Sequence, residues 1–347
     1  MVDTTRRQLL TATAGVGGIG LFAGCIGSDA GTDSAPATGS ADRGTTAQAS
    51  FFVFGDITQQ IAGDAATAEL LVPVGQHGHG WEPGPNVRQA IYEADLFVHG
   101  MESFQPWVDT IVRDLSADGA GVTTLDIGRG VDLLEAGGDD EHTDDEHTDD
   151  EHTDDEHTDD EHTDDEHDRG SVDPHFWMDP LRVKEAAETV REGLIDADPD
   201  SADTYADNTA RFRTELDALH GRAESIVADA GTETILVAGH NSLRYFGDRY
   251  GINVESLTGV SPDDIPTPRD IERAQSIIDD HDLQYVCADP LESQRAADQL
   301  VAETDVEDVL DLTAMPGLTE AWESKGWGYV DVMENVNLPT LERALNA

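Results

Sequence analysis

The sequence predicts an α/β protein with two lobes, each built on a mostly parallel sheet covered by helices, and one long rigid helix joining them. Two observations favour this fold class. Short apolar segments alternate with segments of helical spacing in both halves of the chain, which is typical of parallel sheets covered on both faces. Between the halves, over residues 179–231, apolar residues recur at three- and four-residue spacing. A chain of 347 residues is long enough to build two medium-sized cores.

The N-terminal residues resemble an export signal. Arg6 and Arg7 precede an uncharged stretch of apolar and small residues, which ends in the sequence FAGC at Cys25. This order resembles a twin-arginine signal peptide with a lipobox, so residues 1–24 are expected to be removed and Cys25 to carry a lipid. The alternative, a membrane-spanning anchor helix, would need a longer apolar stretch. Residues 25–49 are rich in small and polar residues and are predicted to be a flexible tether.

The N-terminal lobe is predicted over residues 50–200. ASFFVFGDI is interpreted as a short buried strand running into a helix, ATAELLVPVG as a second strand, NVRQAIYEA as a helix and DLFVHG as another strand. Residues 139–168 of this lobe repeat the unit EHTDD and contain no apolar residue. Their five-residue period matches neither a helix nor a strand, so a disordered, acidic and histidine-rich loop is predicted.

A linker helix is predicted over residues 201–230. Pro199 should end the preceding helix, and Asp200 or Ser201 can cap the next one. At about 1.5 Å per residue the helix would be roughly 40 Å long, enough to contact both lobes and resist hinge closure. The C-terminal lobe, residues 231–347, is predicted to contain the strands ETILVAGH, INVESLTG and LQYVCADP and the helices PRDIERAQSIIDDH and SQRAADQLVAET.

The charge balance excludes one class of partner and indicates an environment. With 73 acidic and 20 basic residues the formal net charge is -53, so the basic face that nucleic acid requires is not expected. Most of the acidic residues lie outside the repeat, so acidity is a property of the whole surface. Its self-repulsion is screened at molar salt, where the Debye length is about 3 Å. The sequence therefore indicates adaptation to high salt.

Three histidines are candidate metal ligands. His79 follows a predicted strand and precedes Gly and Pro, His175 lies in VDPHFWMDP, and His240 directly follows an apolar strand. Ligands of doubly wound sheets bind beyond the carboxyl ends of the strands, where loops would deliver these side chains. Three imidazoles plus a carboxylate or water satisfy tetrahedral Zn²⁺. Any one of them alone is more often a hydrogen-bonded surface or core histidine.

Three segments in order, beginning at DITQQIAGDAATAELLVPVGQHGHGWEP, at DPHFWMDP and at GHNSLRYFGDRYGI, resemble the solute-binding lipoproteins of zinc and manganese ABC importers, the zinc-uptake and treponemal-type family. The resemblance covers nearly all of residues 50–345. It implies metal bound between two α/β lobes, with His79, His175 and His240 as ligands. It also implies a monomer on the outer face of the cell membrane whose partner is a cognate permease with its ATPase.

The family often supplies a fourth ligand from an aspartate in an LDP-like turn, and Asp311 in VLDLTAMPGL occupies that place without the family proline; water is the alternative ligand. His77 stands where the family usually has a non-ligand. Asn241 follows His240 where the family commonly has Asp, which could orient or charge-balance the imidazole, whereas neutral Asn can only hydrogen-bond. Glu82 and Asp179 are expected to hold their loops by capping, or to accept hydrogen bonds from the metal ligands, rather than to bind metal themselves.

The predicted function is extracytoplasmic binding of Zn²⁺ and its delivery to the permease. Manganese or iron is the alternative cargo, since manganese sites favour more oxygen ligands than three imidazoles provide. A zinc hydrolase is disfavoured because the sequence has no HExxH helix, no nucleophile elbow and no clear general base. An adhesive surface lipoprotein is a third possibility. The repeat is interpreted as an accessory metal collector, or else as an expansion that only aids solubility.

Overall fold

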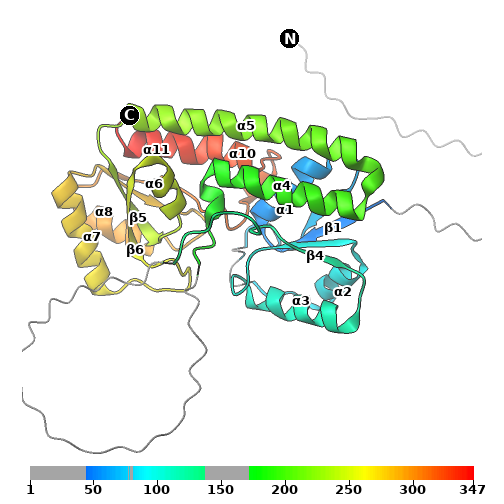
Figure 1. Cartoon of the computed structure of the whole chain (residues 1–347). Helices are drawn as coiled ribbons and strands as arrows, with labels where there is room; N and C mark the ends of the chain where they lie inside the picture. Colours follow the sequence, from blue (N-terminus) through cyan, green and yellow to red (C-terminus); the bar gives the residue numbers. More distant parts are fainter. Residues whose placement is uncertain (1–43, 77, 79–80, 137–171) are drawn as a thin grey trace, which may run out of the picture. The chain divides into compact units, whose positions relative to one another are not determined.

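The computed structural model describes residues 44–76, 78, 81–136 and 172–347 (Figure 1). The predicted signal peptide, Cys25, most of the tether, His77, His79 and the repeat at 139–168 lie outside these residues. In the described part of the chain no helix is long and apolar enough to span a bilayer.

The first lobe contains a four-stranded parallel sheet in the order β2-β1-β3-β4. Its strands are Thr46–Ala49 (β1), Thr67–Leu70 (β2), Leu96–His99 (β3) and Thr123–Asp126 (β4). Its helices are Phe52–Ala62 (α1), Pro85–Glu93 (α2) and Pro106–Asp118 (α3).

The start of this lobe differs from the prediction in two ways. The first strand occupies Thr46–Ala49, inside the segment expected to be tether, and it is largely buried. The apolar stretch from Phe52 onward is helix α1 rather than strand. The first turn of α1, residues 52–55, is wholly buried and apolar, and the polar face of the helix begins only at Asp56. A short continuous apolar run does not by itself distinguish a buried strand from a buried helix.

The second lobe repeats the topology of the first, with the parallel order β6-β5-β7-β8. Its strands are Thr234–His240 (β5), Asn253–Thr258 (β6), Tyr285–Ala288 (β7) and Asp308–Asp311 (β8). Its helices are Arg244–Tyr250 (α6), Pro268–His281 (α7), Arg295–Glu303 (α8), Glu320–Glu323 (α9), Tyr329–Val332 (α10) and Leu338–Ala344 (α11), with a π-helical turn at Met333–Asn337. The predicted fold class is confirmed.

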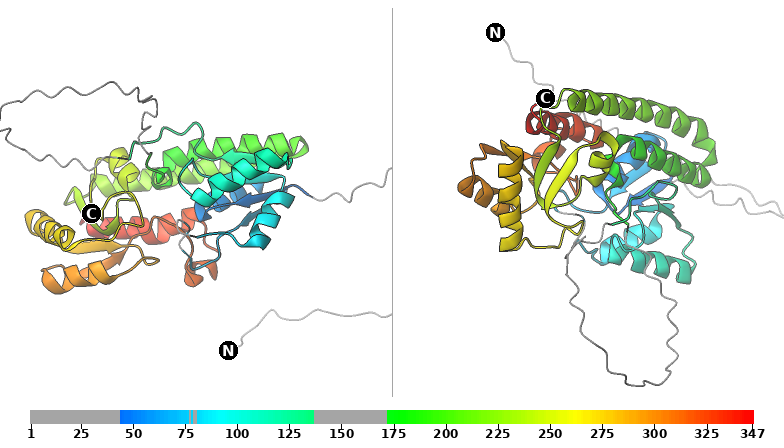
Figure 2. Two further views of the ribbon diagram at one scale, coloured as in Figure 1. Left: turned by 90° about the horizontal axis from the view of Figure 1, so that it is seen from below. Right: turned by 60° about the vertical axis from the view of Figure 1, so that its left-hand side comes forward.

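Two helices connect the sheets. Helix α4 (Pro180–Ala197) begins at Asp179, whose Oδ1 accepts a hydrogen bond from the backbone of Leu181 at 2.9 Å, as expected of a loop-holding residue. A 3-10 turn at Pro199–Ser201 leads into α5 (Ala202–Ala228), which corresponds to the predicted linker helix. Helix α5 packs on α1 and α4 of the first half and on α6, α10 and α11 of the second (Figures 1 and 2).

The main hydrophobic core is continuous between the two sheets. It runs from Phe54 in α1 through Trp177 to Tyr245 in α6 and Met333 beyond α10. Two smaller clusters lie outside it, one around Trp107 under α2 and α3 and one under α7 and α8. The side chains between the lobes therefore belong to one packed interior, in which the candidate site is embedded.

Candidate metal centre

His240 is placed by strand β5. The sequence TILVAGH is almost wholly apolar and forms the buried strand Thr234–His240, of which the histidine is the last residue. Pairing with β6 shifts register between Val237 and His240, so the strand is irregular where the imidazole projects. The residue is 5% exposed. His240 therefore lies at the carboxyl end of a strand, where the sequence predicted it.

His175 is placed by the buried turn that follows it. Phe176, Trp177 and Met178 form a 3-10 turn and are all fully buried. The indole Nε1 of Trp177 donates to the carbonyl of Ala314 at 2.8 Å, and the hydroxyl of Tyr329 donates to the carbonyl of Trp177 at 2.7 Å. These bonds fix the backbone next to His175, whose own side chain is fully buried.

The two imidazoles face each other through the same nitrogen. Nε2 of His175 lies 3.3 Å from Nε2 of His240, and the ring centres are 5.1 Å apart. Two nitrogens that each bind one tetrahedral Zn²⁺ at about 2.0 to 2.1 Å are separated by about 3.3 to 3.4 Å. The observed separation therefore fits two ligands of a single ion.

A carboxylate contacts the opposite nitrogen of each ring. Nδ1 of His175 lies 2.8 Å from Oδ1 of Asp173, and Nδ1 of His240 lies 3.1 Å from Oε1 of Glu292. A carboxylate partner favours the tautomer with its proton on Nδ1, which leaves the Nε2 lone pair available. With both protons on Nδ1, the two closely spaced Nε2 atoms are free to bind one cation together.

Burial keeps His175 in the form that binds metal. The pKa of His175 is lowered, chiefly because desolvation penalises the imidazolium, and Asp173 opposes this by favouring the charged form. Asp173 is itself fully buried, accepts a hydrogen bond from the backbone of His175 at 3.0 Å, and lies 3.6 Å from Arg244. Neutral imidazole is the metal-binding species, so the lowered pKa extends the binding range to lower pH.

Gly78, the residue before His79, packs against the aromatic cluster that contains Trp177. Gly78 donates its backbone N–H to the carbonyl of Pro316, and a Cβ at Gly78 would lie 2.7 Å from the ring of Phe51. Phe51 in turn packs on Trp177, at 5.1 Å between ring centres. Only glycine permits this approach at position 78. His79 itself lies outside the described residues, so its role as a ligand stays a prediction.

Asp311 lies at the end of β8. It pairs with Ala288 in the ladder, is exposed, and its backbone carbonyl accepts a hydrogen bond from Thr340. Among the described residues its carboxylate forms no hydrogen bond or ion pair with His175 or His240. In the same part of the chain no group of three or more His, Cys, Asp or Glu side chains is arranged to hold a metal ion. The assignment of Asp311 as the fourth ligand stays a prediction.

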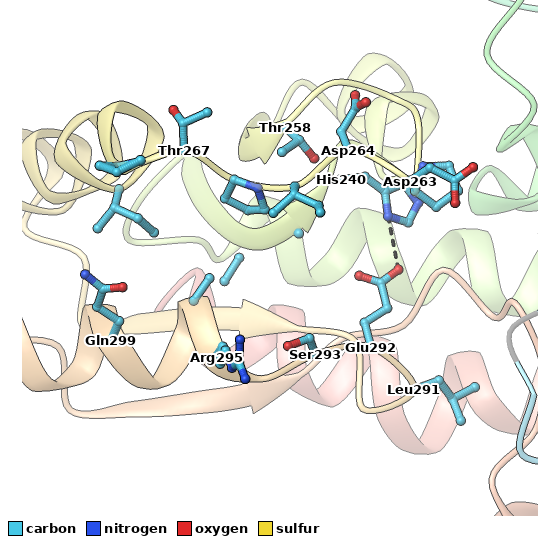
Figure 3. Close-up of a pocket in the computed structure, with 18 residues that line it drawn as sticks. His240, Thr258, Asp263, Asp264, Thr267, Leu291, Glu292, Ser293, Arg295 and Gln299 are labelled. Carbon is cyan, nitrogen blue, oxygen red and sulfur yellow. Dashed lines mark ion pairs between the residues drawn. The ribbon is translucent and has the colours of Figure 1, made fainter. Parts of the chain in front are cut away.

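Sequence reasoning missed Glu292. This residue follows β7, the strand beside β5, so the rule that placed His240 at a strand end could also have drawn attention to it. Glu292 and His240 lie together at one end of a cavity of about 940 Å³ that is lined by the end of β5, the loops after β6 and β7, and helices α7 and α8 (Figure 3). Asp263 and Asp264 line the same cavity.

A short antiparallel bridge joins Glu135 to Val172, which lie on the two sides of residues 137–171. Val172 lies three residues before His175. The hydroxyl of Tyr245 accepts from the backbone of Leu134 at 2.9 Å and donates to the carbonyl of Asp173 at 2.6 Å. Helix α6 of the second lobe thus holds both sides of the bridge, next to the residue that orients His175.

Comparison with known proteins identifies the family of the chain. Residues 48–344 match the family model of the periplasmic component A of the zinc-uptake complex, ZnuA. The chain belongs to this family. It is 27% identical to the high-affinity zinc uptake system protein ZnuA of Bacillus subtilis over 85% of this chain and 86% of that protein. It is 25% identical to the manganese-binding lipoprotein MntA of Halalkalibacterium halodurans over 77% of this chain and 76% of that protein.

Among solved structures, the Zn(II)-bound ZnuA-like domain of Streptococcus pneumoniae AdcA superimposes with a TM-score of 0.67 at 25% identity, covering 88% of this chain and all of that domain. The chain spans 54% of the full length of AdcA, a zinc-binding lipoprotein. The family resemblance and the fold predicted from the sequence are both confirmed.

Proposed function

We propose that this protein binds Zn²⁺ outside the cytoplasm and delivers it to a membrane ABC permease with its ATPase. The observation that carries the proposal is the 3.3 Å separation of the two Nε2 atoms, each on a ring whose Nδ1 faces a carboxylate. The protein is a binding component of a zinc-uptake family, not an enzyme. The B. subtilis relative, named a high-affinity zinc uptake protein, supports zinc as the cargo.

The donor atoms favour zinc over manganese. His175 and His240 both offer imidazole nitrogen, and His79 would add a third, whereas Mn²⁺ prefers sites richer in oxygen. The manganese-binding relative makes Mn²⁺ the competitor to test. The fourth position is assigned to Asp311 or water.

The proposed location is the outer face of the cell membrane. The twin-arginine motif and the FAGC sequence support export and a lipid on Cys25, and a monomer on a tether is the simplest arrangement. The net charge of -53 supports a high-salt environment.

Metal analysis of protein purified without a chelating tag tests the cargo. We expect one tightly bound Zn²⁺ per chain that excess Mn²⁺ does not displace, besides any weaker zinc held by the repeat. Replacement by Mn²⁺ at comparable concentrations would overturn the choice of metal, and a chain with no tight site for either ion would overturn the function.

Single substitutions test the placement of the site. His175→Ala or His240→Ala should weaken zinc binding by about 100-fold or more, because total zinc binding energies of about 10 to 16 kcal/mol are shared among few ligands. His220→Ala is the control, since His220 lies on α5 and contacts Tyr250 and Glu224 instead. Full zinc affinity in the His240 variant would remove that residue from the site.

A further inference from the structure

Glu292 is held in a rigid turn. Asp289, 7% exposed, accepts hydrogen bonds at Oδ1 from the backbone of Leu291 at 2.8 Å and at Oδ2 from the hydroxyl of Thr313 at 2.7 Å. Its carbonyl accepts from the backbone of Glu292 at 3.0 Å and from the side chain of Gln294 at 2.7 Å. These bonds fix the backbone from which the carboxylate of Glu292 reaches His240.

The chain also leaves room for this carboxylate. A Cβ at Gly239, the residue before His240, would lie 3.0 Å from Oε2 of Glu292. That distance is shorter than ordinary van der Waals contact, so glycine allows the carboxylate to lie against strand β5. The side chain of Glu292 is 22% exposed and that of His240 is 4% exposed, so the contact is largely shielded from water (Figure 3).

Asn241 does not take this role. It follows His240, at the position where the family commonly has an aspartate, which could orient or charge-balance the imidazole. Within the described residues its buried Oδ1 has no hydrogen-bond partner, and its backbone N–H donates to the carbonyl of Gly259. The carboxylate beside His240 therefore comes from a different strand end.

We propose that Glu292 is the positioning residue of His240 in cation binding; this inference rests on the proposed function. The carboxylate lies 3.1 Å from Nδ1, favours a proton on that nitrogen, holds the ring with its Nε2 towards His175, and increases the electron density that Nε2 donates to the ion. It contacts the nitrogen that does not face His175, so it acts through the imidazole. Glu292 thus does for His240 what Asp173 does for His175.

The test is zinc affinity of the full chain at neutral pH and high salt, measured by competition with a chelator. Glu292→Ala should lower the affinity about 10- to 100-fold, the usual cost of removing such a partner. Glu292→Gln keeps an acceptor for Nδ1–H but loses the charge, so its loss should be smaller. Glu303→Ala is the control, because Glu303 lies on α8 and contacts Gln275 and Gln299. Unchanged affinity in Glu292→Ala, with a tight site in the wild type, would overturn the inference alone.

A double-mutant cycle separates a positioning residue from a ligand. In a His240→Ala background, Glu292→Ala should cause no further loss, because its effect passes through the missing ring. An equal loss in both backgrounds would make Glu292 an independent ligand and overturn the positioning role. Replacing Zn²⁺ by Co²⁺ adds a spectroscopic readout, whose visible absorption should change in Glu292→Gln even if that variant folds as stably as the wild type. A wild type without a tight zinc site would instead refute the proposed function.

Discussion

Trp177→Phe should destabilise the protein more than the chemically identical change Trp107→Phe. Both indoles are buried among aromatic rings, Trp177 against Phe51 and Phe54 and Trp107 against Trp81 and Phe97. Each substitution removes a similar apolar area, so that cost largely cancels in the comparison. The indole nitrogens differ, because Nε1 of Trp177 donates to Ala314 whereas Nε1 of Trp107 has no hydrogen-bond partner in the described part of the chain.

The magnitude follows from that difference. Ala314 is 2% exposed, so Trp177→Phe leaves a buried carbonyl without its donor, at a cost of about 1 to 3 kcal/mol. Trp107→Phe instead removes a buried donor that was already unpaired. We therefore expect the free energy of unfolding of the Trp177→Phe variant to be about 1 to 3 kcal/mol lower than that of the Trp107→Phe variant.

Urea unfolding of the metal-free proteins at one fixed salt concentration measures this difference. The comparison is valid if both variants keep the same dependence of unfolding free energy on urea, since a changed slope would indicate a changed denatured state. Equal midpoints, or a lower midpoint for Trp107→Phe, would refute the argument that the bond to Ala314 fixes the turn after His175.

Three further outcomes are expected. Deleting residues 139–168 should leave one tight zinc site and abolish the weaker additional sites in a titration. Loss of the tight site would show that the histidines of the repeat are its main ligands. If no zinc-binding step changed, the repeat would have only a solubility role. Zinc at about one hundred times its dissociation constant should add about 2.7 kcal/mol to the free energy of unfolding, and a melting temperature indifferent to zinc would count against the site. Burial lowers the pKa of His175, so between about 6.5 and that lower value the unfolded chain binds a proton that the folded chain does not. The metal-free protein should therefore lose stability as pH falls through this window, and His175→Gln should reduce the slope in urea unfolding at several pH values; an unchanged slope would assign the effect to other groups.

Much of the fold follows from local sequence pattern. Strand β5 lies where a short apolar run predicted a strand, and helix α7 lies where apolar residues at helical spacing predicted a helix. The linker helix was predictable because Pro199 interrupts an otherwise continuous helical pattern. The start of α1 was not, since Phe52 and its neighbours are buried on all sides and lack the polar face that reveals a helix.

The site was predictable in part. That His175 and His240 meet could not be predicted from spacing alone; the family resemblance implied a shared site, and their rings do lie together. Glu292 was not singled out, because acidic residues are abundant throughout this chain and one more after a strand carries little information. Its contact with His240 depends on the turn organised by Asp289, a tertiary feature that no local pattern encodes.

The bridge between Glu135 and Val172 has a consequence for how this gene can change. The two sides of the segment meet at a fixed point, and if residues 139–168 form the disordered loop that the sequence predicts, doubling its length would cost only about 0.6 kcal/mol of loop closure. Replication slippage can therefore add or remove EHTDD units at almost no thermodynamic cost, leaving Asp173 and His175 where they are. Each number of repeats supplies a different number of imidazole and carboxylate groups on the same fold. Gain or loss of repeats can therefore change the number of these groups faster than single substitutions can.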